Sequence, residues 1–295
     1  MLMTALLGAI ELGLLYSLVG LGVYLSFRVL DFPDLTVDGS FPLGGAVAAT
    51  LIVNGMHPII ATAVAIAAGA LSGACTAWLT VQFKILNLLS SILTMIALYS
   101  LNLRIMGRPN VPLLGETTLF TPLNSLSVPR QVVIPIILVI IVILLKVGLD
   151  ALLATQWGLA LRATGANSTM ARAQGVDPGM MIIVGMALSN ALVALAGALF
   201  AQIYGFADVT LGVGTIVLGL AAVIIGETFI PGKTIFQGTL SVILGALAYR
   251  LAIAIALNAN FMGLQAQDLN LVTALLVAIA LILPQTPLKK LTLKN

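Results

Sequence analysis

Apolar segments of about twenty residues recur along almost the whole chain, separated by short polar or glycine-containing stretches. As α-helix, one such segment covers the roughly 30 Å of a bilayer's hydrocarbon core. Hydrophobic residues make up 60% of the 295 residues and charged residues only 8%, whereas a soluble domain carries roughly 25% charged residues. Strands of alternating polarity are absent, which excludes a barrel. The sequence therefore predicts an all-α, polytopic membrane helix bundle.

About nine membrane spans are expected. The second, seventh and ninth are short for a full crossing, so the second in particular could be broken or re-entrant where protein covers its backbone. The first segment lacks the basic region of a signal peptide, so we expect it to be retained as a membrane span and not cleaved off. No linker divides the chain, which predicts one membrane domain over residues 1–295. The expected spans are Thr4 to Phe27, Phe41 to Asn54, Ile59 to Phe83, Leu86 to Met106, Val132 to Leu153, Gly179 to Tyr204, Val213 to Phe229, Ile235 to Asn258 and Leu269 to Leu283.

The basic residues predict the orientation, because Lys and Arg accumulate on the cytoplasmic side of membrane proteins. With the N-terminus outside and the C-terminus in the cytoplasm, nine fall inside and three fall outside. The inner set is Arg28, Lys84, Lys146, Arg162, Arg172, Lys233, Lys289, Lys290 and Lys294, and the outer set is Arg104, Arg108 and Arg130. Because these residues are spread singly, the net charge of +3 reflects topology and contact with the lipid bilayer, and no nucleic-acid partner is expected.

The longest polar, glycine-punctuated segment runs from Gly158 to Pro178. We expect Asn167 to cap a short helix from Ser168 to Gln174, and Gly175 to end it in the left-handed conformation. Asp177 then caps the next helix, whose first residue is proline. The alternative is a solvated connecting loop.

Few residues offer catalytic or metal chemistry. Cys75 and His57 are the single cysteine and histidine, so neither an internal disulfide nor a Cys/His metal cluster is possible, and no cofactor or metal is expected. The stretch before Thr234 superficially resembles a phosphate-binding loop, but Glu227 stands where that loop needs glycine. ATP binding by this chain is therefore not expected.

Two charged residues, Glu11 and Arg250, lie well inside expected spans, at similar depths below the outer surface. Such charges are costly unless they are paired. An ion pair joining two helices is predicted, with a role in a substrate path or proton relay as the alternative.

Other polar residues interrupt otherwise apolar helices. They could line a substrate path, or they could only join helices by hydrogen bonds. The candidates are Asn87, Ser90, Ser91 and Thr94 in the fourth span and Ser189 and Asn190 in the sixth. Glycines such as Gly69, Gly73, Gly212, Gly214, Gly219, Gly238 and Gly245 are expected to let helices approach closely.

The stretch from Gly107 to Arg130 is rich in proline and long for a connection. It is expected to be an ordered surface loop outside the membrane. It could receive a partner there or act as a passive lid.

Three stretches, in this order, resemble the permease subunits of ATP-binding-cassette importers, specifically the branched-chain amino-acid and ribose permease family. Gly13 to Ala46 resembles that family's first hairpin, Leu161 to Gly175 its cytoplasmic coupling segment, and Gly226 to Gly245 its Gly-Pro-Gly loop and following helix. The pattern from Asp31 to Pro42 departs from the usual hairpin and is similar to a branch linked to tryptophan or tyrosine uptake.

The resemblance implies a transport subunit in a bacterial inner membrane, with ATP hydrolysis in separate cytoplasmic chains, an extracytoplasmic solute-binding protein and a second permease copy. Met170 and Ala171 would then insert into a groove of the ATPase and Arg172 would pair with its acidic rim, with Asn167, Ser168 and Gly175 shaping the coupling segment. The implied substrate is a small polar or amphipathic solute, an amino acid, with aromatic amino acids among the candidates. An ion-coupled secondary transporter is the alternative. A membrane enzyme would need a nucleophile, a metal cluster or paired carboxylates, and the sequence offers none of these.

Overall fold

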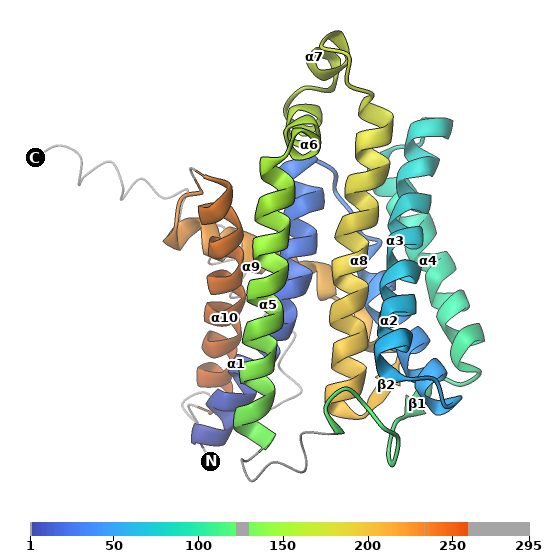
Figure 1. Cartoon of the computed structure of the whole chain (residues 1–295), viewed down its shortest axis with the longest axis vertical. Coiled ribbons are helices and arrows are strands. Elements are labelled where there is room, and N and C mark those ends of the chain that lie inside the picture. The colour runs from blue at the N-terminus through green and yellow to red at the C-terminus, as the bar shows by residue number, and fades with distance from the viewer. Residues whose placement is uncertain (1, 122–129, 233, 259–295) are drawn as a thin grey trace, which may run out of the picture.

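The computed structural model describes residues 2–121, 130–232 and 234–258, and most of these residues lie in long helices (Figure 1). The order of elements is α1 (Leu2–Val23), η1 (Tyr24–Val29, a π-helix), α2 (Val37–Val53), α3 (Pro58–Phe83), α4 (Asn87–Met106), β1 (Asn110–Pro112), α5 (Arg130–Ala154), α6 (Gln156–Ala166), α7 (Ser168–Ala173), α8 (Pro178–Tyr204), β2 (Phe206–Asp208), η3 (Val209–Gly212), α9 (Thr215–Phe229) and α10 (Ile235–Asn258).

Seven helices of the described part are long and apolar enough to cross a membrane, and α2 is a shorter apolar helix. They coincide with the first eight expected spans. The ninth, Leu269 to Leu283, lies outside the described residues. The helix α6 was not expected from the sequence. We call the end of the bundle that carries α6 and α7 the α7 end (Figure 1).

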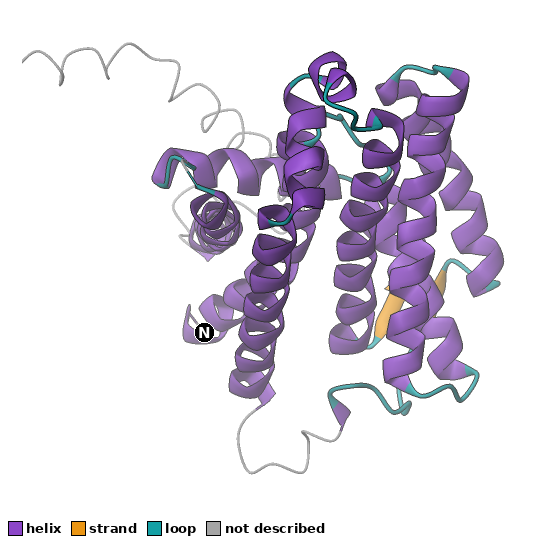
Figure 2. Cartoon of the chain, turned by 45° about the horizontal axis from the view of Figure 1, so that its top comes forward, coloured by secondary structure: helices purple, strands orange, loops and turns teal. Residues whose placement is uncertain are grey.

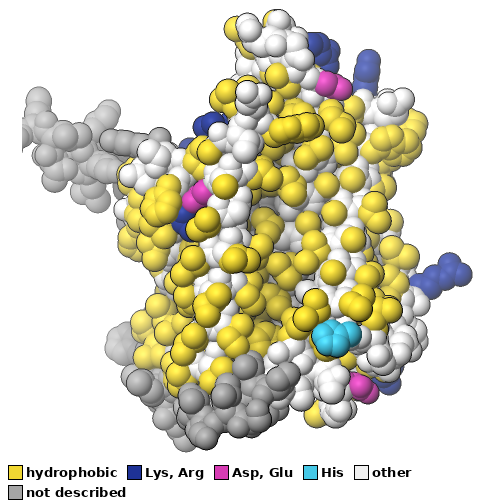
Figure 3. Space-filling model, viewed as in Figure 1, with side chains coloured by type: hydrophobic (Ala, Val, Ile, Leu, Met, Phe, Trp, Pro, Cys, Tyr) yellow, Lys and Arg dark blue, Asp and Glu magenta, His cyan; other side chains and the backbone are white. Residues whose placement is uncertain are grey.

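Hydrophobic side chains cover most of the visible face of the bundle between its two ends, and charged side chains are sparse there (Figure 3). Many belong to α4 and α5. Only 28% of the most apolar 18-residue stretch of α4, and 33% of that of α5, is buried inside the chain. Surface of this kind favours lipid or another apolar partner over water.

The second crossing is broken, as its length suggested. After η1 the chain runs without helix from Leu30 to residue 36 and becomes helical only at Val37. Pro33 favours an extended conformation in the residue before it, and Asp31 has a positive φ of 53°. Because these residues and α2 are largely buried, protein covers the backbone that the break exposes.

Glycines bring α3 and α8 into close antiparallel contact. A β-carbon at Gly69 would collide with Ala194 and with the carbonyl of Asn190, and one at Gly73 would collide with the carbonyl of Met186. The same holds between α10 and α9, where Gly245 lies against the carbonyl of Ala222. The expectation that these glycines serve helix packing is confirmed; Gly214 differs, because a β-carbon added there would have nothing within 4 Å and its φ is +82°.

Two discontinuous segments meet away from both ends of the bundle. In α9, Gly219 packs against Val23 and Val19, and Glu227 pairs with Arg28 near the end of the first crossing. The start of α9, one turn before Gly219, therefore lies inside the bundle and not at a surface. Asp38, in the first turn of α2, accepts hydrogen bonds from the backbone N–H groups of Gly214 (3.2 Å) and Ile216 (2.7 Å) at the start of α9. The first turns of α2 and α9 are therefore joined inside the bundle.

The end opposite α7 carries a small antiparallel sheet of β1 and β2, with Val111 opposite Ala207 (Figure 2). Partial burial acts against ionisation of Asp208, but hydrogen bonds from Thr210 and Asn110 outweigh it and hold the pKa of this carboxyl below its ordinary value. The described part of the Gly107 to Arg130 stretch is thus an ordered loop, while residues 122–129 of it lie outside the described part.

The α2–α8 contact leads to a first prediction. A β-carbon at Gly197 would collide with the carbonyl of Phe41, which cannot move without breaking α2. Gly197→Ala should lower the free energy of unfolding by about 3 kcal/mol, the upper end of overpacking costs, seen as a lower thermal midpoint of the detergent-solubilised protein. Gly148→Ala, on the exposed face of α5 with nothing within 4 Å, is the matched control and should not lower it. Equal midpoints for the two variants would contradict this packing.

Candidate functional site

The segment around α7 is built as its capping residues predicted. The side chain of Asn167 accepts from the N–H of Met170 at 2.9 Å, and Gly175 has a φ of +83°. Asp177 accepts from the N–H of Gly179 at 2.9 Å and caps α8, which begins with Pro178. The predicted short helix between two turns is confirmed, and it projects beyond the ends of the long helices (Figure 1).

The surface that α7 offers differs from the expected one at one position. Met170 is 59% exposed, and Ser168 and Arg172 are exposed as well. Ala171 is only 4% exposed, and the chain turns back after α7, where the carbonyl of Ala171 accepts from the N–H of Val176 at 3.1 Å. The expectation that Ala171 inserts into a partner's groove is therefore wrong for this conformation, whereas Met170 and Arg172 remain available.

The helix α6 fixes α7 to the interior of the bundle. Leu161 is 1% exposed. A β-carbon at Gly165 would collide with the carbonyl of Val29, the last residue of η1, so the backbones of α6 and η1 touch. On α8, Gly185 lies against Leu30 and Leu161. A displacement of α7 must therefore act on the point where the first crossing ends and the broken second crossing begins.

The two ion pairs of the described residues lie toward the α7 end. Arg28 of η1 pairs with Glu227 of α9 at 2.7 Å. Lys146 of α5 pairs with Asp150 one turn further along the same helix. The first pair ties η1 to α9, and the second stays within α5, one turn before that helix ends.

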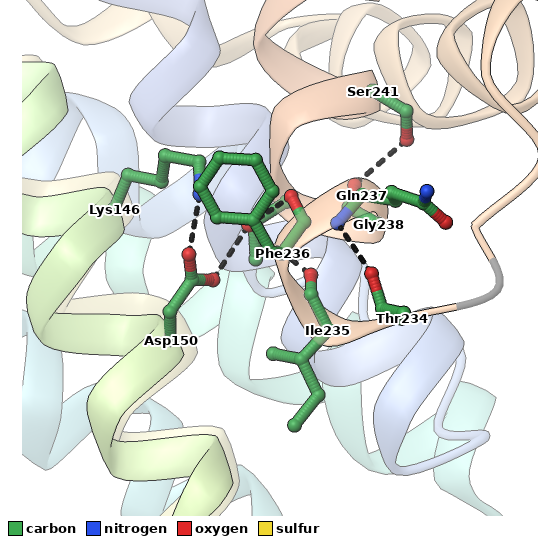
Figure 4. Close-up of polar contacts among 9 residues, drawn as sticks. Lys146, Asp150, Thr234, Ile235, Phe236, Gln237, Gly238 and Ser241 are labelled. Atoms are coloured by element: carbon green, nitrogen blue, oxygen red, sulfur yellow. Dashed lines mark hydrogen bonds and ion pairs between the residues drawn. The ribbon is translucent and has the colours of Figure 1, made fainter.

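The pair in α5 also reaches α10 (Figure 4). Lys146 is 5% exposed, and its ammonium lies over the ring of Phe236, 3.6 Å from the centroid. Asp150 accepts a further hydrogen bond from the hydroxyl of Thr239 at 2.6 Å. A buried lysine is therefore compensated by a carboxylate and an aromatic ring, as burial of a charge demands.

A buried polar network lies at the break before α2, and sequence analysis missed its central residue. Asp34 is 2% exposed and accepts from the N–H of Thr36 at 2.9 Å and from the amide of Asn190 at 2.8 Å. Ser40 donates to the amide oxygen of Asn190 at 2.7 Å and shares a hydrogen bond with Ser72 at 2.8 Å. The network joins α2, α3 and α8 around the unwound segment.

The residues expected along a substrate path are mostly engaged within the chain. Ser90 shares a hydrogen bond of 2.5 Å with Thr80 of α3, and Ser189 donates to the carbonyl of Gly22 at 2.7 Å. Ser91 and Thr94 donate to carbonyls of their own helix. These contacts favour the alternative in which such residues join or satisfy helices, and a path role for them, and for Asn87, stays a prediction.

Glu11 and Arg250 do not form the predicted ion pair. The ion pairs of the described residues at 4.0 Å or less do not include them. Arg250 instead places its guanidinium over the ring of Tyr16, 4.2 Å from the centroid, and Glu11 hydrogen-bonds with the side chain of Tyr204. Arg250 packs beside α1 two residues from Glu11, since a β-carbon at Gly13 would lie 3.5 Å from the Cβ of Arg250, but aromatic side chains contact both charges.

Residues 5–283 match the family described as branched-chain amino acid transport system / permease component. The chain belongs to this family. It is 39% identical over 276 residues to the tyrosine transport system permease protein of Clostridioides difficile (strain R20291), covering 93% of this chain and 90% of that one. It is 26% identical over 254 residues to the ribose import permease protein RbsC of Escherichia coli (strain K12), covering 84% and 76%.

The fold is also similar to that of a solved structure, PsaBC from Streptococcus pneumoniae in complex with Fab. The TM-score is 0.51 at 16% identity, with 94% of this chain and 90% of that chain covered. The family and the helices together make the chain a multi-pass membrane permease component of an ATP-binding-cassette-type transporter.

The buried pair in α5 leads to a second prediction. Lys146→Met leaves the Asp150 charge without its cation and should cost about 3–5 kcal/mol, as for other broken buried pairs. Lys146→Met combined with Asp150→Asn removes both charges while an amide remains to face Thr239. The double variant should therefore regain most of the lost thermal midpoint in detergent. Losses that simply add would show that the two charges do not act as a pair.

Proposed function

We propose that the chain is the permease subunit of an ATP-driven importer and that α7 receives the force from a separate cytoplasmic ATPase. The observation that carries this proposal is the combination of an exposed Met170 and Arg172 with an α6 packed backbone to backbone against η1. An exposed apolar side chain beside a cation is suited to a pocket with an acidic rim. ATP hydrolysis is assigned to the other chain.

The proposed orientation places the α7 end in the cytoplasm and the N-terminus outside, in a bacterial inner membrane. The described basic residues toward the α7 end are Arg28, Lys84, Lys146, Arg162 and Arg172, against Arg104, Arg108 and Arg130 at the opposite end. The excess is small but has the sign that the positive-inside rule requires.

The proposed substrate is a small amphipathic solute, an amino acid and most specifically an aromatic one. Support comes from the 39% identity to a protein named as a tyrosine transport system permease. The ribose import permease protein is more distant, at 26% identity.

The proposed assembly contains two permease copies, two ATP-binding subunits and an extracytoplasmic solute-binding protein. The poorly buried apolar helices α4 and α5 offer surface for lipid or for the second copy. The sheet of β1 and β2, at the end opposite α7, offers an ordered surface to the binding protein.

In the proposed mechanism, the ATPase moves α7, and α6 transmits the movement to η1 and α8. The broken second crossing follows η1 directly, so its unwound residues are the first to be displaced. A packed interface of this kind transmits a shift because it cannot deform continuously.

The orientation can be tested with single cysteines in a Cys75→Ala background. Arg172→Cys should resist a membrane-impermeant maleimide in intact spheroplasts and react after permeabilisation. Leu114→Cys, at a residue 90% exposed near the opposite end, should react in intact spheroplasts. The reverse pattern would place α7 outside the cell and refute the coupling proposal.

The coupling role predicts a specific defect when an acidic residue is introduced at α7. Arg172→Glu and Met170→Glu should each reduce co-purification of the ATPase and abolish ATP-dependent uptake in proteoliposomes, while the permease keeps its thermal midpoint, because both side chains are exposed. Arg104→Glu, an exposed arginine at the end of α4, is the matched control and should leave co-purification unchanged. Normal assembly and uptake in both α7 variants would rule out docking at this helix.

A further inference from the structure

A cavity of about 340 Å³ lies where α2, α4 and the segment before α9 meet. This volume is at the lower end of the range for small-molecule sites, roughly 300–1,000 Å³. Its walls are mainly apolar and include Pro42, Met95, Tyr99 and Val213. Two polar residues, Asp38 and Asn102, interrupt this apolar lining. None of these residues belongs to the set that the sequence suggested for a substrate path.

Asn102 lies in the wall of the cavity and carries an unused hydrogen-bonding group that a small side-chain rotation would expose to it. Its side chain is 0% exposed, and its amide nitrogen donates to the carbonyl of Gly39 at 3.3 Å. That bond directs the amide, and the amide oxygen has no hydrogen-bond partner. A buried acceptor without a partner is costly, so this oxygen favours a ligand that donates a hydrogen bond.

Asp38 brings a negative charge to the same cavity. Each of its carboxylate oxygens accepts a backbone N–H from the start of α9, and no ion pair with a cation is found for it among the described residues. Burial acts against the charge of Asp38, the helix terminus favours the ionised carboxylate, and each oxygen keeps further acceptor capacity. A cation fits beside this carboxylate, whereas an anion is repelled.

Tyr99 and Met95 supply the apolar side of the cavity. Both project from α4, one helical turn apart, and Tyr99 is 51% exposed. An aromatic face and a thioether pack favourably against a flat ring. The chemistry therefore selects a ligand with an ammonium group at one end and an apolar or aromatic body at the other.

We propose that this cavity is the permease's own subsite for the transported amino acid, with the ammonium group at Asp38 and Asn102 and the side chain against Met95 and Tyr99. The inference rests on the proposed function and deepens it, because it assigns ligand contacts to named residues. The ammonium group is required for binding here, and the ligand's carboxylate is not.

The test is protection of a cavity cysteine from alkylation. Val213→Cys is made in a Cys75→Ala background and expressed with the ATPase subunit, and membranes are treated with N-ethylmaleimide without ATP. Phenylalanine and tyramine, which carry the ammonium group, should slow alkylation several-fold. The carboxylate 4-hydroxyphenylpropionate should not. Ile140→Cys, on the exposed face of α5, is the control cysteine and should show no protection.

Asp38→Asn and Asn102→Leu, each added to Val213→Cys, should abolish protection by tyramine. If Asp38→Asn loosens the start of α9, the rate of alkylation without ligand will rise, and Asn102→Leu then decides the matter. Protection by 4-hydroxyphenylpropionate, or protection that survives both substitutions, would overturn the proposed subsite.

Uptake by cells expressing the whole transporter separates this inference from the proposed function. Aromatic amino-acid uptake without any protection at Val213→Cys would remove the subsite and leave the function. Protection by tyramine in a transporter that takes up no amino acid would support the cavity's ammonium preference and overturn the proposed substrate.

Discussion

The hydrogen bonds between Asp38 and the start of α9 solve the main problem of this architecture, which is a helix that begins inside the bundle. The first N–H groups of a helix have no partner within it, and in a membrane water cannot supply one. Asp38 accepts two of them, at Gly214 and Ile216. The carboxylate in turn needs compensation, which the helix terminus provides. One contact thus allows two broken crossings to coexist and leaves a charged, partly unsaturated group beside a cavity.

A short path of packed and covalently linked residues joins this contact to the exposed helix α7. The backbone of α6 touches the end of η1 at Gly165 and Val29. From there the chain passes through the unwound residues, which Asp34 holds to α8 through Asn190, and reaches Asp38. The ion pairs of Arg28 and Lys146 stiffen the surrounding helices. A displacement at α7 would therefore reach the junction of α2 and α9 through residues that are already packed or hydrogen-bonded to one another, so little of the movement would be lost on the way.

Sequence features that act locally were sufficient to predict much of this. Span length, the caps at Asn167 and Asp177, and the close approach at Gly69 depend on a few neighbouring residues, and the structure bears them out. Features that depend on direction around a helix were not predictable. Glu11 and Arg250 lie at matching depths, yet aromatic side chains contact each of them. Ala171 is buried on the side of α7 toward which the chain turns back after the helix, an effect that the residue type does not encode.

The same distinction explains why the sequence pointed to hydroxyl residues as the path and passed over Asn102 and Asp38. A serine or threonine in a helix can satisfy its hydroxyl with a carbonyl three or four residues earlier, as Ser91 and Thr94 do. An asparagine side chain has both a donor and an acceptor group. In Asn102 only the donor, the amide nitrogen, has a hydrogen-bond partner within the chain. A carboxylate has still more acceptor capacity. In a membrane bundle, polar groups that cannot satisfy themselves within their own helix are therefore the better guides to a ligand, and they are recognised only when the neighbouring helices are in place.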